Sequence, residues 1–234
     1  MSATAQAVKE IRESGWTLLK GVIPEAPARD IRYVLFRVGA CCGVIATLYV
    51  ENKVRPPFYT RPTVIKDEPR LATWLLDERV AGVIAGALGA DAHVTSTTMD
   101  IHEPGTTAGD WHAGEPYDAV SMAASSPGRH LTLHGFFSPF REDNGGLPVI
   151  PGSHRSGERG REHVITGGLG DVAILDSRLL RRVAANPSDV MRLSVITGFS
   201  ADAAPSVDPA SFVPQAIYDK FPPPAQRLFR YFRR

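Results

Sequence analysis

Apolar residues in the first ninety positions recur mostly at helical spacing. Ala5, Val8 and Ile11 share one face of a helix predicted over residues 5–14, which ends at Gly15. The same periodicity predicts further helices over residues 25–37, 69–76 and 78–88. Runs rich in β-branched and aromatic residues favour strands at 16–19 and 43–50. The proline-rich stretch 55–62 is predicted to be a loop.

From residue 93 onward the pattern changes to short strand-like runs separated by turns rich in Gly, Pro, Asn and Asp. The runs cover residues 93–102, 117–123, 129–137, 147–150, 162–166, 171–175 and 190–200. Regularly spaced short strands are typical of a sandwich or barrel rather than of a parallel sheet. We expect a single domain over residues 1–234, with a mostly helical support layer at 1–90, a β core at 91–200 and a C-terminal extension at 201–234.

Composition and charge exclude several classes of protein. The chain has 234 residues, of which 43% are hydrophobic and 22% charged, so it can bury a sizeable core. A net charge of +1 gives no reason to expect nucleic acid or a membrane surface as a partner. The N-terminus lacks the features of a signal peptide. The only cysteines, Cys41 and Cys42, are adjacent and are expected to be reduced thiols, which makes a cytoplasmic location the expectation.

Candidate chemistry begins at the stretch Asp110-Trp111-His112-Ala113-Gly114-Glu115, which follows a strand-like run and the turn at Glu103-Pro104-Gly105. A histidine two residues before a carboxylate would supply half of a metal site. The residue two positions after His112 is Gly114, which has no ligand atom. The stretch is therefore a metal site, an altered metal site or the relic of one.

Several stretches together resemble the phytanoyl-CoA dioxygenase family. The most specific is the run from Asn144-Gly145-Gly146 to Pro151-Gly152-Ser153-His154, and segments 13–23, 101–112, 170–180 and 192–194 match in the same order. The resemblance implies a mainly β fold with flanking α-helices: a double-stranded β-helix (jelly roll, cupin-like) core with N-terminal helices packed on one side. It also implies iron(II)- and 2-oxoglutarate-dependent oxygenase chemistry.

The iron ligands that the resemblance implies are matched only in part. The family binds iron through His-x-Asp and a distal histidine, and His112 stands at the position of the first ligand. Gly114 stands where the carboxylate is expected, and Arg181 stands where the distal histidine is expected. Arginine cannot deprotonate to become a ligand, and its charge repels a divalent cation. We therefore expect no metal and no cofactor, with iron(II) and 2-oxoglutarate as the alternative.

Arg192 and Ser194 match the Arg-x-Ser that, by the resemblance, holds the far carboxylate of 2-oxoglutarate. Arginine offers a planar, bidentate grip on a carboxylate. Ser194, two residues on, shares the same strand face. The alternative is that Arg192 pairs with an internal acid such as Asp176 or Asp189.

A metal-free mechanism has its own candidate residues. His112 can serve as a general acid or base near neutral pH. Glu115 would orient it or act as its partner acid, and Arg181 would stabilise an enolate or a carboxylate. The pocket is expected to be lined by Trp111, Tyr117, Met122, Phe136 and Phe137, with His134 as a substrate contact or a second non-standard ligand. Such a pocket suits a small, partly apolar molecule, in the hypothesis one that carries a carboxylate.

Three functional hypotheses remain open from the sequence. The favoured one is a metal-independent enzyme, an isomerase, cyclase or lyase in natural-product tailoring. The second is an iron(II)- and 2-oxoglutarate-dependent oxygenase or halogenase with a non-standard ligand set. The third is a non-catalytic binding protein or the partner of an active homologue. The sequence also leaves a homodimer open.

Overall fold

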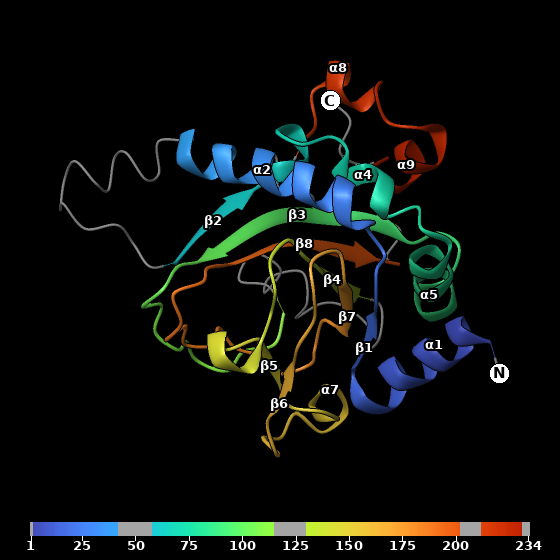
Figure 1. Ribbon diagram of the computed structural model, residues 1–234. Coiled ribbons are helices and arrows are strands. Elements are labelled where there is room, and N and C mark those ends of the chain that lie inside the picture. The colour runs from blue at the N-terminus through green and yellow to red at the C-terminus, as the bar shows by residue number, and fades with distance from the viewer. Residues whose placement is uncertain (1, 42–57, 115–129, 202–211, 231–234) are drawn as a thin grey trace.

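The computed structural model describes residues 2–41, 58–114, 130–201 and 212–230 (Figure 1). The strands expected at 43–50 and 117–123 therefore lie outside the described residues. The helices are α1 (Ala3–Ser14), α2 (Glu25–Cys41), η1 (Val64–Lys66), α4 (Leu71–Trp74), α5 (Glu78–Leu88), η2 (Glu142–Asn144), α7 (Ser153–Ser156), α8 (Gln215–Tyr218) and α9 (Pro223–Leu228). The strands are β1 (Trp16–Leu19), β2 (Phe58–Pro62), β3 (His93–His102), β4 (His130–Phe136), β5 (Leu147–Val149), β6 (His163–Ile165), β7 (Val172–Asp176) and β8 (Arg192–Ser200).

The strands are arranged in two layers. Six of them form an antiparallel sheet in the order β1-β7-β4-β8-β3-β2, and β5 pairs with β6 in a smaller sheet. In Figure 1, α2 and α4 lie above β2 and β3, whereas β5 and β6 lie on the opposite side of the larger sheet. One face of the larger sheet is thus covered by helices, and the other faces the smaller sheet.

The larger sheet buries a different hydrophobic core on each face, because successive side chains of a strand point to opposite sides. On the helical side, Met99 and Ile101 of β3 and Leu193 and Val195 of β8 pack with Leu35 of α2. The core on the other side contains Phe136, Phe140, Val149, Leu175 and Leu179. Full burial of each such side chain contributes about 1.5–3 kcal/mol.

A close contact at Gly15 joins the first helix to the β layers. Gly15 ends α1 with a φ of 88°, as the sequence predicts. A Cβ atom at this position would lie 2.6 Å from Leu179 Cδ1 and 2.7 Å from His154 Nδ1, so only glycine fits. His154 Nε2 also lies 3.2 Å from the carbonyl oxygen of Arg12, which ties the Pro-Gly-Ser-His turn to the end of α1.

Three predicted element boundaries are wrong. The stretch predicted to be a loop at 55–62 contains the strand β2, which among the described strands pairs only with β3 and lies at the edge of the sheet. An edge strand tolerates proline at its end because one side of its backbone needs no ladder hydrogen bonds. The helix predicted at 69–76 is the single turn α4, and α2 extends to Cys41 rather than ending at residue 37. None of the described helices is long and apolar enough to cross a membrane.

Candidate functional site

A cavity of about 60 Å³ lies between the larger sheet and the start of β5. It is lined from β3, β4 and β8 by polar residues on alternate strand positions, a pattern that points their side chains to one side of the sheet. The residues that line it among those described are Asp100, His102, His112, His134, Phe140, Gly146, Leu147, Arg181, Arg182, Val183, Ala184, Arg192, Ser194 and Ile196. The predicted site residues His112, His134, Arg181, Arg192 and Ser194 are all among them.

His112 and Arg181 face each other directly. Each donates its backbone N–H to the carbonyl oxygen of the other at 2.9 Å, and the two form an isolated β-bridge. A second bridge joins Arg181 to Val149 of β5. The chain around Arg181 therefore lies between the smaller sheet and the His112 segment, and hydrogen bonds hold it on both sides.

The ring of His112 is oriented by its own loop. Its Nδ1 lies 3.2 Å from the carbonyl oxygen of Asp110. A carbonyl oxygen can only accept, so this hydrogen bond requires the proton on Nδ1. Nε2 of the neutral ring then carries the lone pair, which is the form a general base needs.

His134 and Arg181 are buried beside each other. Arg181 is 3% exposed, and its Nη1 lies 3.4 Å from the carbonyl oxygen of Ser177. His134 is 4% exposed, and its Nε2 has no hydrogen-bond partner among the described residues. Burial, then the charge of Arg181, then His112 hold the pKa of His134 well below its usual range. His134 is therefore neutral at physiological pH.

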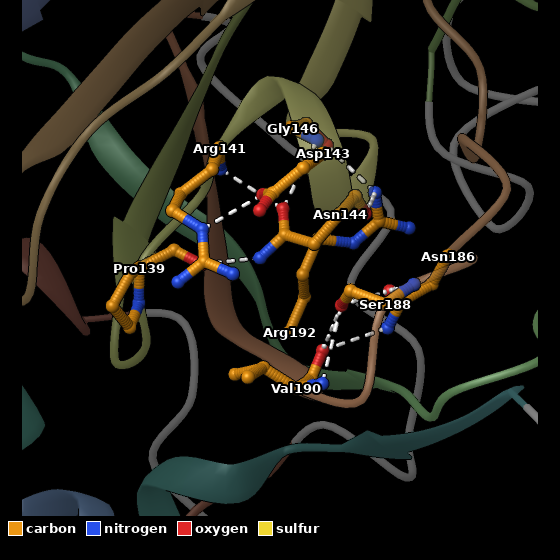
Figure 2. Close-up of polar contacts among 9 residues, drawn as sticks. All are labelled: Pro139, Arg141, Asp143, Asn144, Gly146, Asn186, Ser188, Val190 and Arg192. Atoms are coloured by element: carbon orange, nitrogen blue, oxygen red, sulfur yellow. Dashed lines mark hydrogen bonds and ion pairs between the residues drawn. The ribbon is translucent and has the colours of Figure 1, made fainter.

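The terminal nitrogen atoms of Arg192 donate hydrogen bonds to the main chain. Nη1 donates to the carbonyl oxygens of Asn144 at 2.6 Å and Gly146 at 3.1 Å, and Nη2 donates to that of Ala184 at 2.7 Å (Figure 2 shows the contacts with Asn144 and Gly146). Burial lowers the pKa of Arg192 to about 10. The side chain therefore connects β8 to the turn before β5 and to the segment after Arg181.

The predicted acid partners of Arg192 are not its contacts. The carboxylate of Asp176 instead accepts from the guanidinium of Arg178, with Oδ2 2.9 Å from Nη2. The terminal nitrogen atoms of Arg192 contact carbonyl groups rather than Asp176 or Asp189. Sequence reasoning missed this arrangement because main-chain carbonyl groups leave no signature in a sequence.

Besides Arg182, two polar residues of β3 line the cavity that were not among the predicted site residues. Asp100 and His102 lie at alternate positions of β3, and Ser194 pairs directly with Asp100 across the sheet. Burial, then the charge of Arg192, lower the pKa of His102 to about 3, so its ring is neutral. Polar residues alternating with the apolar Met99 and Ile101 were the sequence signal that could have identified them.

Three of the residues expected to line the pocket, Trp111, Phe136 and Phe137, are not part of its described lining. Trp111 is outside the described lining, and the Arg182 guanidinium lies 5.0 Å from its ring centroid. Phe136 and Phe137 are fully buried in the two cores on opposite faces of the sheet, so the prediction that they open the pocket is wrong. Glu115, Tyr117 and Met122 lie outside the described residues.

The family model described as Phytanoyl-CoA dioxygenase (PhyH) matches residues 52–191 of this chain, which is more than half of its length. The chain belongs to the phytanoyl-CoA dioxygenase family. The match includes both His112 and Arg181. The family prediction made from the sequence motifs is thereby confirmed.

Solved structures similar to this PhyH-family chain share its fold at low sequence identity. The non-heme alpha ketoglutarate dependent carbocyclase SnoK from nogalamycin biosynthesis has a TM-score of 0.66 and 19% identity, with 86% of this chain and 84% of that chain covered. The non-heme alpha ketoglutarate dependent epimerase SnoN from nogalamycin biosynthesis has a TM-score of 0.66 and 18% identity, with 85% of this chain and 83% of that chain covered. The structure of EctD from S. alaskensis with 2-oxoglutarate and 5-hydroxyectoine has a TM-score of 0.67 and 17% identity, with 86% of this chain and 76% of that chain covered. The predicted fold, a cupin-like double-stranded β-helix with flanking helices, is confirmed.

The described residues of this PhyH-family chain do not fit the iron ligand set of the family. No three His, Cys, Asp or Glu side chains in the described part of the chain are grouped so that they could hold a metal ion. Gly114 has no side chain, and its positive φ of 76° and its 2.6 Å hydrogen bond to the carbonyl of Ser177 suit glycine. Opposite His112 stands the permanent cation Arg181.

Proposed function

We propose that this PhyH-family protein is an enzyme that acts on a small organic molecule by metal-independent acid–base and electrostatic chemistry. The substrate is partly apolar and bears a carboxylate. The reaction is an isomerisation, cyclisation or elimination in natural-product tailoring. The observation that carries the proposal is the bridge between His112 and Arg181, which sets a potential base beside a fixed positive charge.

The chemistry of this pair is proton transfer next to a carbonyl group. Nε2 of His112 removes a proton from carbon, and the electron pair of the C–H bond moves onto the carbonyl oxygen to form an enolate. The guanidinium of Arg181 stabilises that oxygen, most strongly because the site is buried. Return of the proton to another atom gives an isomer, attack of the enolate within the molecule gives a ring, and loss of a β-leaving group gives an alkene.

The other predicted residues have supporting roles in this proposal. Neutral His134 and Ser194 supply hydrogen bonds from the larger sheet, and both line the cavity with Arg181. Trp111 is expected from the sequence to be a further substrate contact, and the roles expected for Glu115 and Tyr117 lie outside the described residues. The Arg182 guanidinium that covers Trp111 is itself held by Glu162, with Nη2 and Oε2 2.9 Å apart.

Arg192 is held by the main chain through three of its five N–H donors. Both terminal nitrogen atoms already donate to carbonyl oxygens of Asn144, Gly146 and Ala184. Its Nε is buried and has no hydrogen-bond partner among the described residues, so Arg192 keeps donors that could still contact a ligand carboxylate. Because the described residues do not fit the iron ligand set, we derive no step through iron or 2-oxoglutarate.

The similar structures support the reaction class. Two of them carry titles that name a carbocyclase and an epimerase of nogalamycin biosynthesis. The same titles name alpha ketoglutarate dependence, which favours the second candidate function, an iron(II)- and 2-oxoglutarate-dependent enzyme with a non-standard ligand set.

Solvent deuterium exchange tests the proposal. The protein is incubated in D₂O, without oxygen and with a chelator, with a panel of small carboxylate-bearing carbonyl compounds, and exchange at carbon is followed by NMR. We expect exchange with the natural protein, loss with His112→Gln, and no change with His163→Gln, a matched exposed histidine on β6. Activity that stops on chelation or on removal of oxygen would refute the proposal.

Anaerobic titration with iron(II) and 2-oxoglutarate tests the second candidate. The proposal expects no visible charge-transfer band. A band that saturates at one iron per chain would establish the metal-dependent alternative.

A further inference from the structure

The helix α2 carries the two exposed large hydrophobic side chains found among the described residues. Tyr33 is 65% exposed and Phe36 is 36% exposed. Ile31 and Leu35 of the same helix are buried in the core on the helical side of the larger sheet, which α2 covers (Figure 1). Residues three apart share one face of a helix, so Tyr33 and Phe36 form an exposed aromatic face. Covering that face with a partner would remove apolar surface from water.

The residues on this face have the spacing of a coiled-coil seam. In a heptad lettered a to g, Ala26 and Tyr33 take position a, and Arg29 and Phe36 take position d. All four are exposed. Two helices of a coiled coil meet through positions a and d. The core-facing residues of α2 fall at positions c and f, on the opposite side, so a partner at the seam would leave the core contacts in place.

The charges beside the seam match a second copy of the same helix in one orientation only. Glu25 and Arg32 take position g, and Asp30 and Arg37 take position e. In an antiparallel pair, g faces g and e faces e, so each acid would lie opposite an arginine of the other copy. In a parallel pair, g faces e, which would set Glu25 against Asp30 and Arg32 against Arg37. The pattern therefore favours an antiparallel pair and opposes a parallel one.

Three of these four charges are available for such contacts. Among the described residues, no ion pair joins Asp30, Arg32 or Arg37 to another side chain. The guanidinium of Arg32 lies 5.9 Å from the ring centroid of Phe36, and that of Arg37 lies 6.0 Å from the ring centroid of Tyr33. The two cations therefore lie over the exposed rings without being neutralised.

We propose that α2 is a dimerisation surface, and that it packs antiparallel against α2 of a second copy across a two-fold axis. Such an interface is isologous, so each complementary contact occurs twice. Tyr33 would lie opposite Arg29 of the second copy, a favourable cation–π arrangement. The pair between Glu25 and Arg29 within one chain is exposed and weak, which leaves Glu25 able to contact Arg32 of the second copy.

The size of this surface sets the expected strength. A helix of 17 residues is about 25 Å long, and one such helix from each copy gives an interface at the low end of the range, below about 1,200 Å². We therefore expect a dimer that dissociates on dilution, with a Kd of about 10–100 µM at low salt. This inference does not rest on the proposed function.

The test is sedimentation velocity of the full chain from about 5 µM to about 500 µM. We expect a shift from one chain to twice that mass, and a weaker shift at high salt. Tyr33→Ser should weaken dimerisation roughly ten-fold, since both copies lose the ring. Lys9→Glu is the control, because it reverses an exposed charge on α1 and should change the Kd less than about two-fold. Circular dichroism checks that each variant is folded.

Two charge reversals test the orientation. Asp30→Arg and Arg37→Asp each set like charges opposite one another twice in an antiparallel dimer, so each variant alone should dimerise at least about ten-fold more weakly. An equimolar mixture of the two should recover the natural affinity, because each chain then supplies the charge that the other lacks.

The inference is overturned if the chain stays monomeric up to about 500 µM or if Tyr33→Ser dimerises as the natural protein does. A mixture of the charge variants that associates no better than either variant alone would exclude the antiparallel contact. Tighter association of Asp30→Arg would indicate a parallel pair and contradict the proposal, because only there does the change remove a repulsion with Glu25.

Discussion

Replacement of Arg192 by methionine separates a structural clamp from a ligand anchor. If Arg192 serves only to bind a ligand carboxylate, its loss should relieve the ligand-free protein of a costly buried charge. If it is the clamp that its contacts describe, the same change leaves the carbonyl groups of Asn144, Gly146 and Ala184 without their donor. The two roles therefore predict effects of opposite sign on stability.

The magnitude follows from the contacts. Hydrogen bonds from a charged donor contribute roughly 1.5–3 kcal/mol each, so the three contribute about 4.5–9 kcal/mol. Against this stands the desolvation of the guanidinium, which lowers the pKa of Arg192 to about 10 and corresponds to roughly 3 kcal/mol. Arg192→Met should therefore lower the free energy of unfolding by about 2–6 kcal/mol, since methionine replaces most of the apolar stem.

The assay is urea unfolding of the ligand-free protein, followed by fluorescence and circular dichroism. Arg29→Met is the control, because Arg29 and Glu25 form an exposed ion pair and its loss should cost less than about 1 kcal/mol. An Arg192→Met variant as stable as the natural protein, or more stable, would refute the clamp.

Three other predictions concern buried polar groups and glycine in the same region. The pKa of His134 is lowered in the folded state, so its contribution to stability is complete above about pH 6.5 and falls as the pH drops. In urea unfolding between pH 6 and 4.5, His134→Gln should reduce the dependence of the unfolding free energy on pH by up to about 1.4 kcal/mol per pH unit. An unchanged pH dependence would contradict the burial of the ring. Gly145→Ala should lower stability by about 2–4 kcal/mol in the same assay, because its Cβ would lie 2.4 Å from Arg192 Nη1 at a φ of 93°; a loss below about 1 kcal/mol would argue against this packing. Asn186→Ala should cost about 2–3 kcal/mol by thermal unfolding, since its buried amide donates to the carbonyl groups of His102 and Val190, and a neutral effect would place those contacts in doubt.

The sequence predicted what depends on local pattern. Alternating side chains identified β3 and β8, and glycine at position 15 identified the end of α1. The family motifs placed Arg181 opposite His112, and the two are joined by a β-bridge.

What the sequence could not predict depends on tertiary contacts. The partners of Arg192 are carbonyl groups between 8 and 48 residues away, and any residue can supply a carbonyl. The strand β2 escaped prediction because its prolines signal a loop, whereas its neighbour β3 supplies the pairing that makes it a strand. The burial of Phe136 and Phe137 could not be predicted either, because aromatic character alone does not distinguish a core residue from one in a pocket wall.

The two bridges that hold residue 181 also bear on how such a site can change during evolution. The main chain there is fixed by hydrogen bonds to His112 and by the bridge to Val149, and neither involves the side chain. A substitution at 181 can therefore exchange one functional group for another without moving the strand that carries it. A fold built in this way can acquire a new reaction by one replacement at a position that the backbone keeps in place.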